Sequence, residues 1–283
     1  MKKTITTALA LALAVSAHGA AIHTGLLNYW DFDGNGDDTA GSYAESNSTV
    51  DDDAVATGTA GAAVITTGSG GLFGEAADFE RDTGVDGAFI VSNSNDVDFA
   101  NEDISISLWA QFEDGNSGNW QALLAKGEGD NYRISTNRRN PGNDQASTAI
   151  GGAGDLNSGF NIQDNANWNH IVVTAPNGGN VNIYVNGALQ NTSAGTSTIA
   201  NVDTSTPDAL WIGNNGGATD TNRMWDGLID DVAQWDRALT PEEISLIYTS
   251  GQNGIALGAI IPEPSTGILL GLSGLLLCVR RRK

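Results

Sequence analysis

Short runs in which apolar and polar residues alternate make up much of this chain, and this pattern restricts the fold more than any other feature. In residues 104–109, Ile104, Ile106 and Leu108 alternate with two serines and a tryptophan. Residues 181–186 alternate in the same way. Successive side chains of a strand point to opposite faces of its sheet, so each run predicts a strand with one buried face. Many short strands of this kind predict an all-β sandwich or barrel.

The same reasoning extends to the rest of the chain. Residues 171–174 and 181–185 are separated by a segment that contains Asn-Gly, which favours a hairpin. The other predicted strands are residues 26–32, 88–92, 121–126, 132–136, 209–213 and 228–235. We expect residues 37–61 and 138–157 to form long loops.

One helix is predicted, at residues 240–251. Thr240 offers an N-cap hydroxyl, Pro241 suits the first helical position, and Glu243 stands three residues after the cap. Gly251 is a natural stop for a helix. The body of the chain is therefore predicted to be all-β with one short C-terminal helix.

The N-terminal end has the composition of an export signal. Residues 1–21 combine a basic start, an apolar run at 5–15 and a small-residue exit, which is typical of a secretory signal peptide. The apolar run is shorter than the roughly 20 residues that a membrane-spanning helix needs. We expect a signal helix that is removed on export across the inner membrane.

The C-terminal tail, residues 256–283, has the opposite polarity. A Pro-Glu-Pro sequence precedes an uncharged segment at 265–279, and a basic cluster at 280–283 ends the chain. Basic residues remain on the cytoplasmic side of a membrane, so this order predicts a transmembrane-type helix. The residues that define the tail are Pro262, Glu263, Pro264, Arg280, Arg281 and Arg282.

These three parts in this order resemble the PEP-CTERM sorting signal. The resemblance implies an exosortase-type protease as a partner, which cleaves near the Pro-Glu-Pro. It also implies that the inner membrane holds the protein only transiently, before the body reaches the cell surface or the extracellular matrix.

Charge and cysteine content exclude several classes of function. The formal net charge is −21, and six of the 13 basic residues lie in the two ends. Such an acidic body does not bind nucleic acid by neutralising phosphates. The one cysteine, Cys278, lies in the tail, so the body has neither a disulfide nor a thiolate site. No linker divides the body, which we expect to be one domain at residues 22–255.

Five phrases in order give the body a family resemblance. They are found at residues 26–33, 74–79, 104–110, 168–187 and 227–244, and they include Trp-Asp-Phe-Asp, Trp-Asn-His-Ile-Val-Val-Thr and Gly-Leu-Ile-Asp-Asp-Val. The chain resembles the LamG-like jelly-roll family of the concanavalin A-like lectin/glucanase superfamily over about residues 26–250. The resemblance implies a jelly-roll β-sandwich of two antiparallel sheets.

Side chains with carboxylate and amide oxygens follow the first predicted strand, and such ligands suggest that a hard cation binds there. Residues 31–38 begin like an EF-hand loop, but Ser42 stands where that loop has glutamate, and no helices flank it. The family resemblance implies instead a structural calcium ion at Asp33, Asp38 and Asp230, with Asp231 as a substitute. The alternative is that these carboxylates only cap turns.

No catalytic set is found, and we predict that the protein is not an enzyme. His23 and His170 are the only histidines of the body, so few residues could serve as the base of a Ser-His-Asp triad. Glu75, Asp78 and Glu80 lack the glucanase spacing, because residues 75 and 78 would face opposite sides of a strand.

Binding remains as the predicted function. Sugar sites combine aromatic faces with a few polar groups. The candidate ligand-binding residues are Trp120, Tyr132, Arg133, Asn214, Arg223 and Trp225. We expect an exported cell-surface or matrix protein that contacts carbohydrate or exopolysaccharide. Two alternatives remain open: a purely structural matrix protein without a dedicated ligand, and a degenerate or unrecognised glycoside hydrolase.

Overall fold

The computed structural model of the 283-residue chain describes residues 22–66, 68, 70–81, 86–113, 120–127, 131–137, 144–163, 167–199, 209–216 and 223–260. The predicted signal helix at 1–21 lies outside these residues, as does the sorting tail with Pro262, Glu263, Pro264, Arg280, Arg281 and Arg282. Within the described ranges, no helix is long and apolar enough to cross a membrane.

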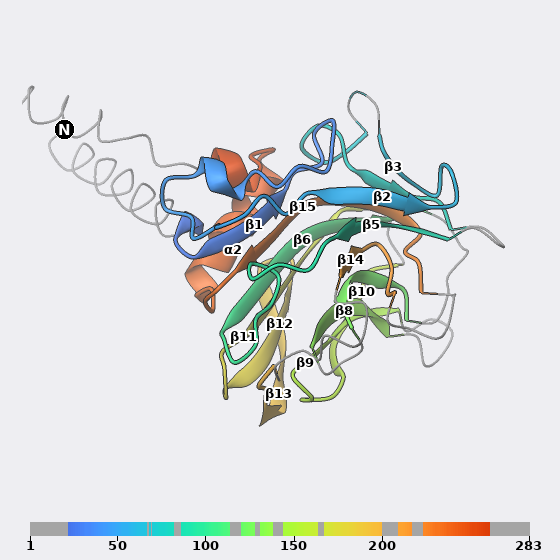
Figure 1. The fold of residues 1–283 in the computed structure, drawn as a ribbon. Helices are drawn as coiled ribbons and strands as arrows, with labels where there is room; N and C mark the ends of the chain where they lie inside the picture. The colour runs from blue at the N-terminus through green and yellow to red at the C-terminus, as the bar shows by residue number, and fades with distance from the viewer. Residues whose placement is uncertain are drawn as a thin grey trace, which may run out of the picture.

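Two antiparallel sheets form the body, as the sequence predicts (Figure 1). Sheet A has eight strands, with β1 (Leu26–Trp30) paired to β15 beside the main order. That order is β13 (Ala188–Thr196), β12 (Asn180–Val185), β11 (Asn169–Ala175), β6 (Ile104–Phe112), β15 (Gly227–Trp235), β4 (Ala77–Phe79) and β3 (Ala63–Ile65). Sheet B has the order β10 (Leu156–Asn161), β9 (Gln145–Ile150), β8 (Tyr132–Asn137), β7 (Ala122–Lys126), β14 (Leu210–Ile212), β5 (Gly87–Val91) and β2 (Ala54–Gly58).

Alternate residues of each strand form the core. In sheet B, Ile212 pairs with Phe89 on one side and with Leu124 on the other, and all three side chains are buried. In sheet A, Ile106 of β6 pairs with Val173 of β11, and both are fully buried. These side chains belong to one large apolar cluster. Burial of apolar surface, at about 25 cal/mol per Å², therefore stabilises a body that has no cysteine.

Both predicted loops contain regular structure, so that prediction is wrong. Residues 37–61 include β2 and the short 3-10 helix η1 (Ala40–Ser42), and residues 138–157 include β9. Four of the five β2 residues are exposed, so buried and exposed residues do not alternate along this strand. Half of the β9 residues are polar, yet five of the six are buried because neighbouring strands and the other sheet cover them.

The predicted helix is confirmed as α2 (Pro241–Gln252). The Thr240 hydroxyl accepts a hydrogen bond from Glu243 N at 3.2 Å, and the Glu243 carboxylate accepts one from Thr240 N at 2.8 Å. This reciprocal capping box satisfies two backbone donors at the start of the helix.

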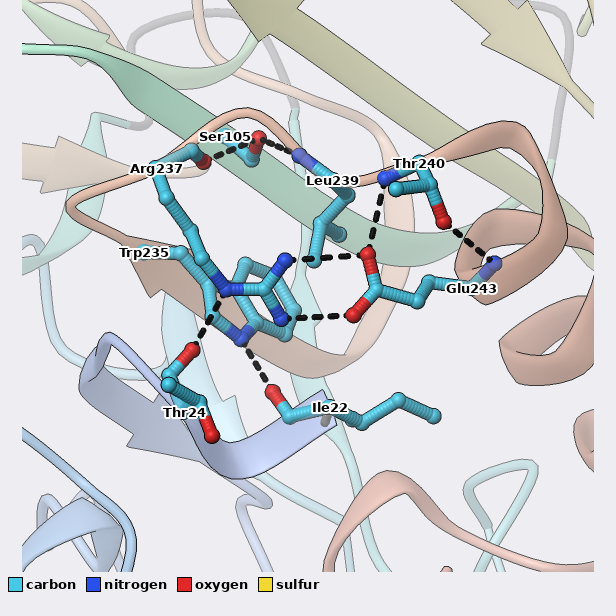
Figure 2. Close-up of polar contacts among 8 residues, drawn as sticks. All are labelled: Ile22, Thr24, Ser105, Trp235, Arg237, Leu239, Thr240 and Glu243. Atoms are coloured by element: carbon cyan, nitrogen blue, oxygen red, sulfur yellow. Dashed lines mark hydrogen bonds and ion pairs between the residues drawn. The ribbon is translucent and has the colours of Figure 1, made fainter. Parts of the chain in front are cut away.

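A set of polar contacts, which we call the clasp, joins the start of the described chain to the segment after β15 (Figure 2). The Arg237 guanidinium donates two hydrogen bonds to the Glu243 carboxylate, at 2.9 and 2.8 Å, and a third to Thr24 O at 2.6 Å. The indole of Trp235 donates to Ile22 O at 2.6 Å. Charge-assisted, bidentate bonds of this kind fix geometry strongly, so the clasp holds residues 22–24 against α2.

Ser105 connects the clasp to sheet A. Its hydroxyl donates to Arg237 O at 2.7 Å and accepts from Leu239 N at 2.9 Å (Figure 2). A second apolar cluster lies beneath these contacts and includes Ile22, Leu257 and Ile260. The packed body thus continues beyond residue 255, through the 3-10 helix η2 (Leu257–Ala259).

Candidate functional site: the outer face of sheet B and the Asp230–Asp231 bulge

The outer face of sheet B, opposite the core, brings an aromatic side chain and an arginine into one row. Trp211 of β14 pairs with Ala125 of β7, and Ala125 pairs with Arg133 of β8. Strand alternation places these residues on the side opposite Leu124 and Ile212. Trp211 is half-buried.

Two predicted ligand residues meet on this face. The guanidinium carbon of Arg133 lies 5.6 Å from the centre of a Trp120 ring, which is a cation–π distance. Arg133 also pairs with Asp155 at 2.5 Å and is only 8% exposed. Trp120 has a φ of +58°, an uncommon value for a bulky residue, and it is half-buried. The structure therefore forms a Trp–Arg pair that sequence spacing alone does not reveal.

The other predicted ligand residues divide into two groups. Asn214 is turned towards β5, where its amide donates to Asp86 Oδ1 at 2.6 Å and to Gly87 O at 3.1 Å. Arg223 is half-buried, and its carbonyl accepts a bond from Ala122 N.

Tyr132 and Trp225 are fully buried core residues. Tyr132 donates its hydroxyl to Val97 O at 2.8 Å, and Trp225 packs edge-on against Phe112. The expectation of ligand contact is therefore corrected for these two rings, because neither presents a surface. Trp211 was missed, although its place between the apolar residues Leu210 and Ile212 already predicts an outward-facing aromatic side chain.

The predicted calcium ligands lie at three places, one in a bulge within β15 and two in the segment that follows β1. A bulge interrupts the pairing of β15 with β6 after Asp230, and Asp231 has a φ of +52°. The bulge lets two successive aspartates contact different segments. Asp230 Oδ2 accepts bonds from Leu72 N at 2.8 Å and Phe73 N at 3.1 Å.

Asp231 accepts bonds from the Tyr29 hydroxyl and from Leu257 N, the latter at 2.7 Å. Asp33 contacts the loop that Asp230 holds, because its Oδ1 accepts from Glu75 N at 2.8 Å. Asp38 lies apart from this loop, and its Oδ1 accepts from Tyr29 N at 2.8 Å and from Ala40 N at 3.0 Å. Asp38 is therefore a turn-capping carboxylate.

The two aspartates of the bulge are buried without a compensating positive charge in the described part of the chain. Asp230 is fully buried, and its Oδ1 has no hydrogen-bond partner among the described residues. Burial, followed by the charge of Asp231, raises the pKa of Asp230 to about 8. Burial raises the pKa of Asp231 to about 7, and the charges of Asp31 and Asp33 add to this shift. The bulge therefore holds a buried carboxyl oxygen without a partner among the described residues, and a cation bound there would favour the ionised form of both aspartates.

A different carboxylate group lies near β4 and the end of β6. Asp78, Glu80 and Glu113 have oxygens within 4.8 Å of one another. Glu80 and Glu113 are exposed, so water and salt screen their charges. Asp78 Oδ1, like Asp230 Oδ1, is buried without a hydrogen-bond partner among the described residues, and burial raises the pKa of Asp78. The group differs from the bulge in that its other two carboxylates lie at the surface.

His170 lies inside the fold and not on a surface. Its Nε2 shares a 2.8 Å hydrogen bond with the Ser107 hydroxyl, and its ring stacks on Trp109 with centroids 4.8 Å apart. His170 is fully buried, and burial lowers its pKa to about 3. It is therefore neutral at ordinary pH and enclosed by the fold.

The two antiparallel sheets define a jelly-roll β-sandwich. Residues 83–245 match the model of the concanavalin A-like lectin/glucanases superfamily, and the chain belongs to this superfamily. A comparison with curated protein sequences finds no match.

Several solved structures have the same fold. Domain 4 of AbnA, a GH43 extracellular arabinanase from Geobacillus stearothermophilus solved with arabinotriose, is 20% identical, with a TM-score of 0.56 over 79% of this chain and 98% of that one. The binding domain of Paraclostridial Mosquitocidal Protein 1 is 15% identical, with a TM-score of 0.55 over 81% of this chain and 53% of that one. The binding domain of botulinum neurotoxin DC, in complex with rat synaptotagmin II, is 17% identical, with a TM-score of 0.56 over 82% and 52%. At these identities the similarity establishes the fold alone.

Proposed function

We propose that the body is a non-enzymatic carbohydrate-binding domain whose site lies on the outer face of sheet B. The observation that carries the proposal is the grouping of Trp211, Trp120 and Arg133 on and beside that face. Aromatic rings stack on the apolar faces of sugar rings, and a fixed guanidinium supplies directional donors. The arabinanase domain supports the proposal, because that domain has the same fold and was solved in complex with arabinotriose.

A glycan array followed by calorimetry tests this function. The full chain is applied to neutral and acidic glycans, including arabino-oligosaccharides, with and without EDTA. Trp211→Ala and Trp120→Ala should each weaken binding about tenfold, which corresponds to the loss of about 1.4 kcal/mol of aromatic contact. Leu189→Ala is the matched control, because Leu189 is 54% exposed on β13 of the other sheet. Binding of no glycan under any condition would favour the structural matrix protein over the lectin.

We further propose a structural calcium site at Asp33, Asp230 and Asp231. Support comes from the unpartnered Oδ1 of buried Asp230 and from the shared loop that Asp33 and Asp230 hold. Asp38 is left out because backbone N–H groups already satisfy its carboxylate. A cation bound only to the folded state stabilises it by mass action.

Thermal unfolding in calcium and in EDTA tests the metal site. Calcium should raise the Tm of the wild type, Asp230→Asn should abolish the rise, and Asp38→Asn should retain it at a lower starting Tm. An equal rise in wild type and Asp230→Asn would place any calcium elsewhere.

The ends of the chain support a proposal about location. We infer export by the segment at 1–21 and sorting through Pro262, Glu263 and Pro264, with an exosortase-type protease as the partner. Replacement of Pro262–Pro264 by alanines should leave the protein in the inner-membrane fraction at its uncut mass. Unchanged release of this variant would refute the sorting step.

A further inference from the structure

Lys126 is buried, which is unusual for a lysine. The chain has four lysines, and three of them are Lys2, Lys3 and Lys283, in its two ends. The fourth, Lys126, is 1% exposed and ranks among the largest fully buried side chains of the described residues. Lysine normally keeps its ammonium group in water. Burial of the amine of the single lysine in the body costs free energy unless a specific interaction compensates for it.

Lys126 points towards the interior of the sandwich. It is the last residue of β7, two positions after the core residue Leu124, and it pairs with buried Tyr132 of β8. Strand alternation therefore directs its side chain to the core side of sheet B. There its Nζ donates a hydrogen bond to Oδ1 of Asn93, which follows β5. The amine nitrogen thus lies beside the carboxamide carbon of Asn93.

A buried carboxylate accompanies this pair. Asp52 is 6% exposed, and its charge interacts with that of Lys126. Its Oδ2 accepts a hydrogen bond from the Ser94 hydroxyl at 2.5 Å, which fixes the carboxylate next to the Asn93 segment. Amine, carboxamide and carboxylate are the three groups that an amide-forming reaction between two side chains requires: a nucleophile, an electrophile and a proton relay.

We propose that Lys126 and Asn93 become joined by an intramolecular isopeptide bond. Asp52 accepts a proton from the lysine ammonium, and the free amine attacks Cγ of Asn93. A C–N bond forms, Asp52 passes its proton to the carboxamide nitrogen, and the original C–N bond of the carboxamide breaks to release ammonia. The attacking nitrogen then loses its second proton to this ammonia, which leaves as ammonium. The product is a secondary amide between the two side chains. No oxidant, reductant or further reactant is needed.

The bond would take the place of a disulfide in this fold. Lys126 ends β7 and Asn93 follows β5, while β14 lies between these strands in sheet B. The covalent loop encloses residues 93–126 and therefore β6 at the centre of sheet A. Such a link restricts the unfolded chain as a disulfide does, and it is insensitive to reduction.

Mass spectrometry of a tryptic digest of the full chain tests the bond directly. Trypsin cuts after Arg81, Lys126 and Arg133, so an unlinked chain yields peptides 82–126 and 127–133. The linked chain should remain uncut at Lys126 and yield one peptide, 82–133, lighter than its sequence mass by about 17 Da, the mass of ammonia. Fragmentation of this peptide should give no backbone ions from within the 93–126 loop.

Two variants and one alternative product define the controls. Lys126→Arg keeps the positive charge, and Asp52→Asn keeps the side-chain shape. Neither variant should form the bond, so both should yield peptide 82–126 at its sequence mass. Normal cleavage at Lys126 in the wild type would overturn the proposal. A loss of about 17 Da combined with cleavage at Lys126 would also overturn it, because that product is a succinimide of an asparagine. The wild-type digest tests for the isopeptide bond even if a variant does not fold.

Discussion

Burial of His170 predicts a specific loss of stability in mild acid. The pKa of this residue falls from 6.5 to about 3 on folding, because burial disfavours the imidazolium. The unfolded chain therefore binds a proton below about pH 6.5 that the folded chain rejects. The contribution of His170 is complete above the unfolded pKa and is lost as pH falls towards the folded pKa.

The magnitude follows from these two values. Between about pH 7.5 and about pH 5, the unfolded histidine gains nearly one full proton and the folded one gains almost none. Integration over this interval gives a loss of about 2 kcal/mol in the free energy of unfolding. The 0% exposure of His170 justifies the calculation without correction for solvent screening.

Urea unfolding at the two pH values measures this effect. A double variant, Ser107→Ala with His170→Phe, removes the hydrogen-bonded pair together and keeps an aromatic ring against Trp109. Its stability should change by about 2 kcal/mol less than that of the wild type over the same pH interval. His23, whose pKa is also lowered by burial, is present in both proteins and cancels. Equal pH dependence in the two proteins would refute the assignment of His170 as a buried neutral base.

The remaining predictions concern the helix and its packing. Glu243→Ala removes both the bidentate partner of the clasp arginine and half of the capping box, so urea unfolding should show a loss of about 2–3 kcal/mol. Glu242→Ala, at the exposed neighbouring position, should change stability by less than about 0.5 kcal/mol, and equal losses would contradict the role of the clasp. Gly251→Ala would place a Cβ closer to Cζ2 of Trp109 than van der Waals radii allow. The free energy of unfolding should therefore fall by about 1–3 kcal/mol, with a lower Tm. Gly195→Ala, which meets nothing within 4 Å, should be close to neutral, and a neutral Gly251→Ala would show that α2 is free to shift.

Most of the fold could be predicted because its signals are local. Alternation located β6 and β12, and the Asn-Gly between two β-rich runs indicated β11. The residues Thr240, Pro241 and Glu243 located the helix within about a residue of its observed start. The strands that were missed have no such signal. The exposed β2 and the half-polar β9 are strands because their neighbours pair with them.

The candidate site was harder to predict because it depends on which strands become neighbours. Trp120 and Arg133 were both candidates, but their contact arises from the pairing of β7 with β8. Tyr132 is one residue from Arg133 and faces the opposite side of the sheet. Both residues therefore looked equally suitable as ligand contacts until the pairing of the strands separated them.

The sequence by itself determined the class of fold, the helix cap, and a body without cysteine and with a single lysine. Only the tertiary structure decided that Asp230 would be buried beside Asp231, and that Lys126 would meet Asn93. The physical reason is that strand alternation and helix capping involve residues a few positions apart, whereas the desolvation of a carboxylate or an amine depends on segments that the order of the sheets brings together.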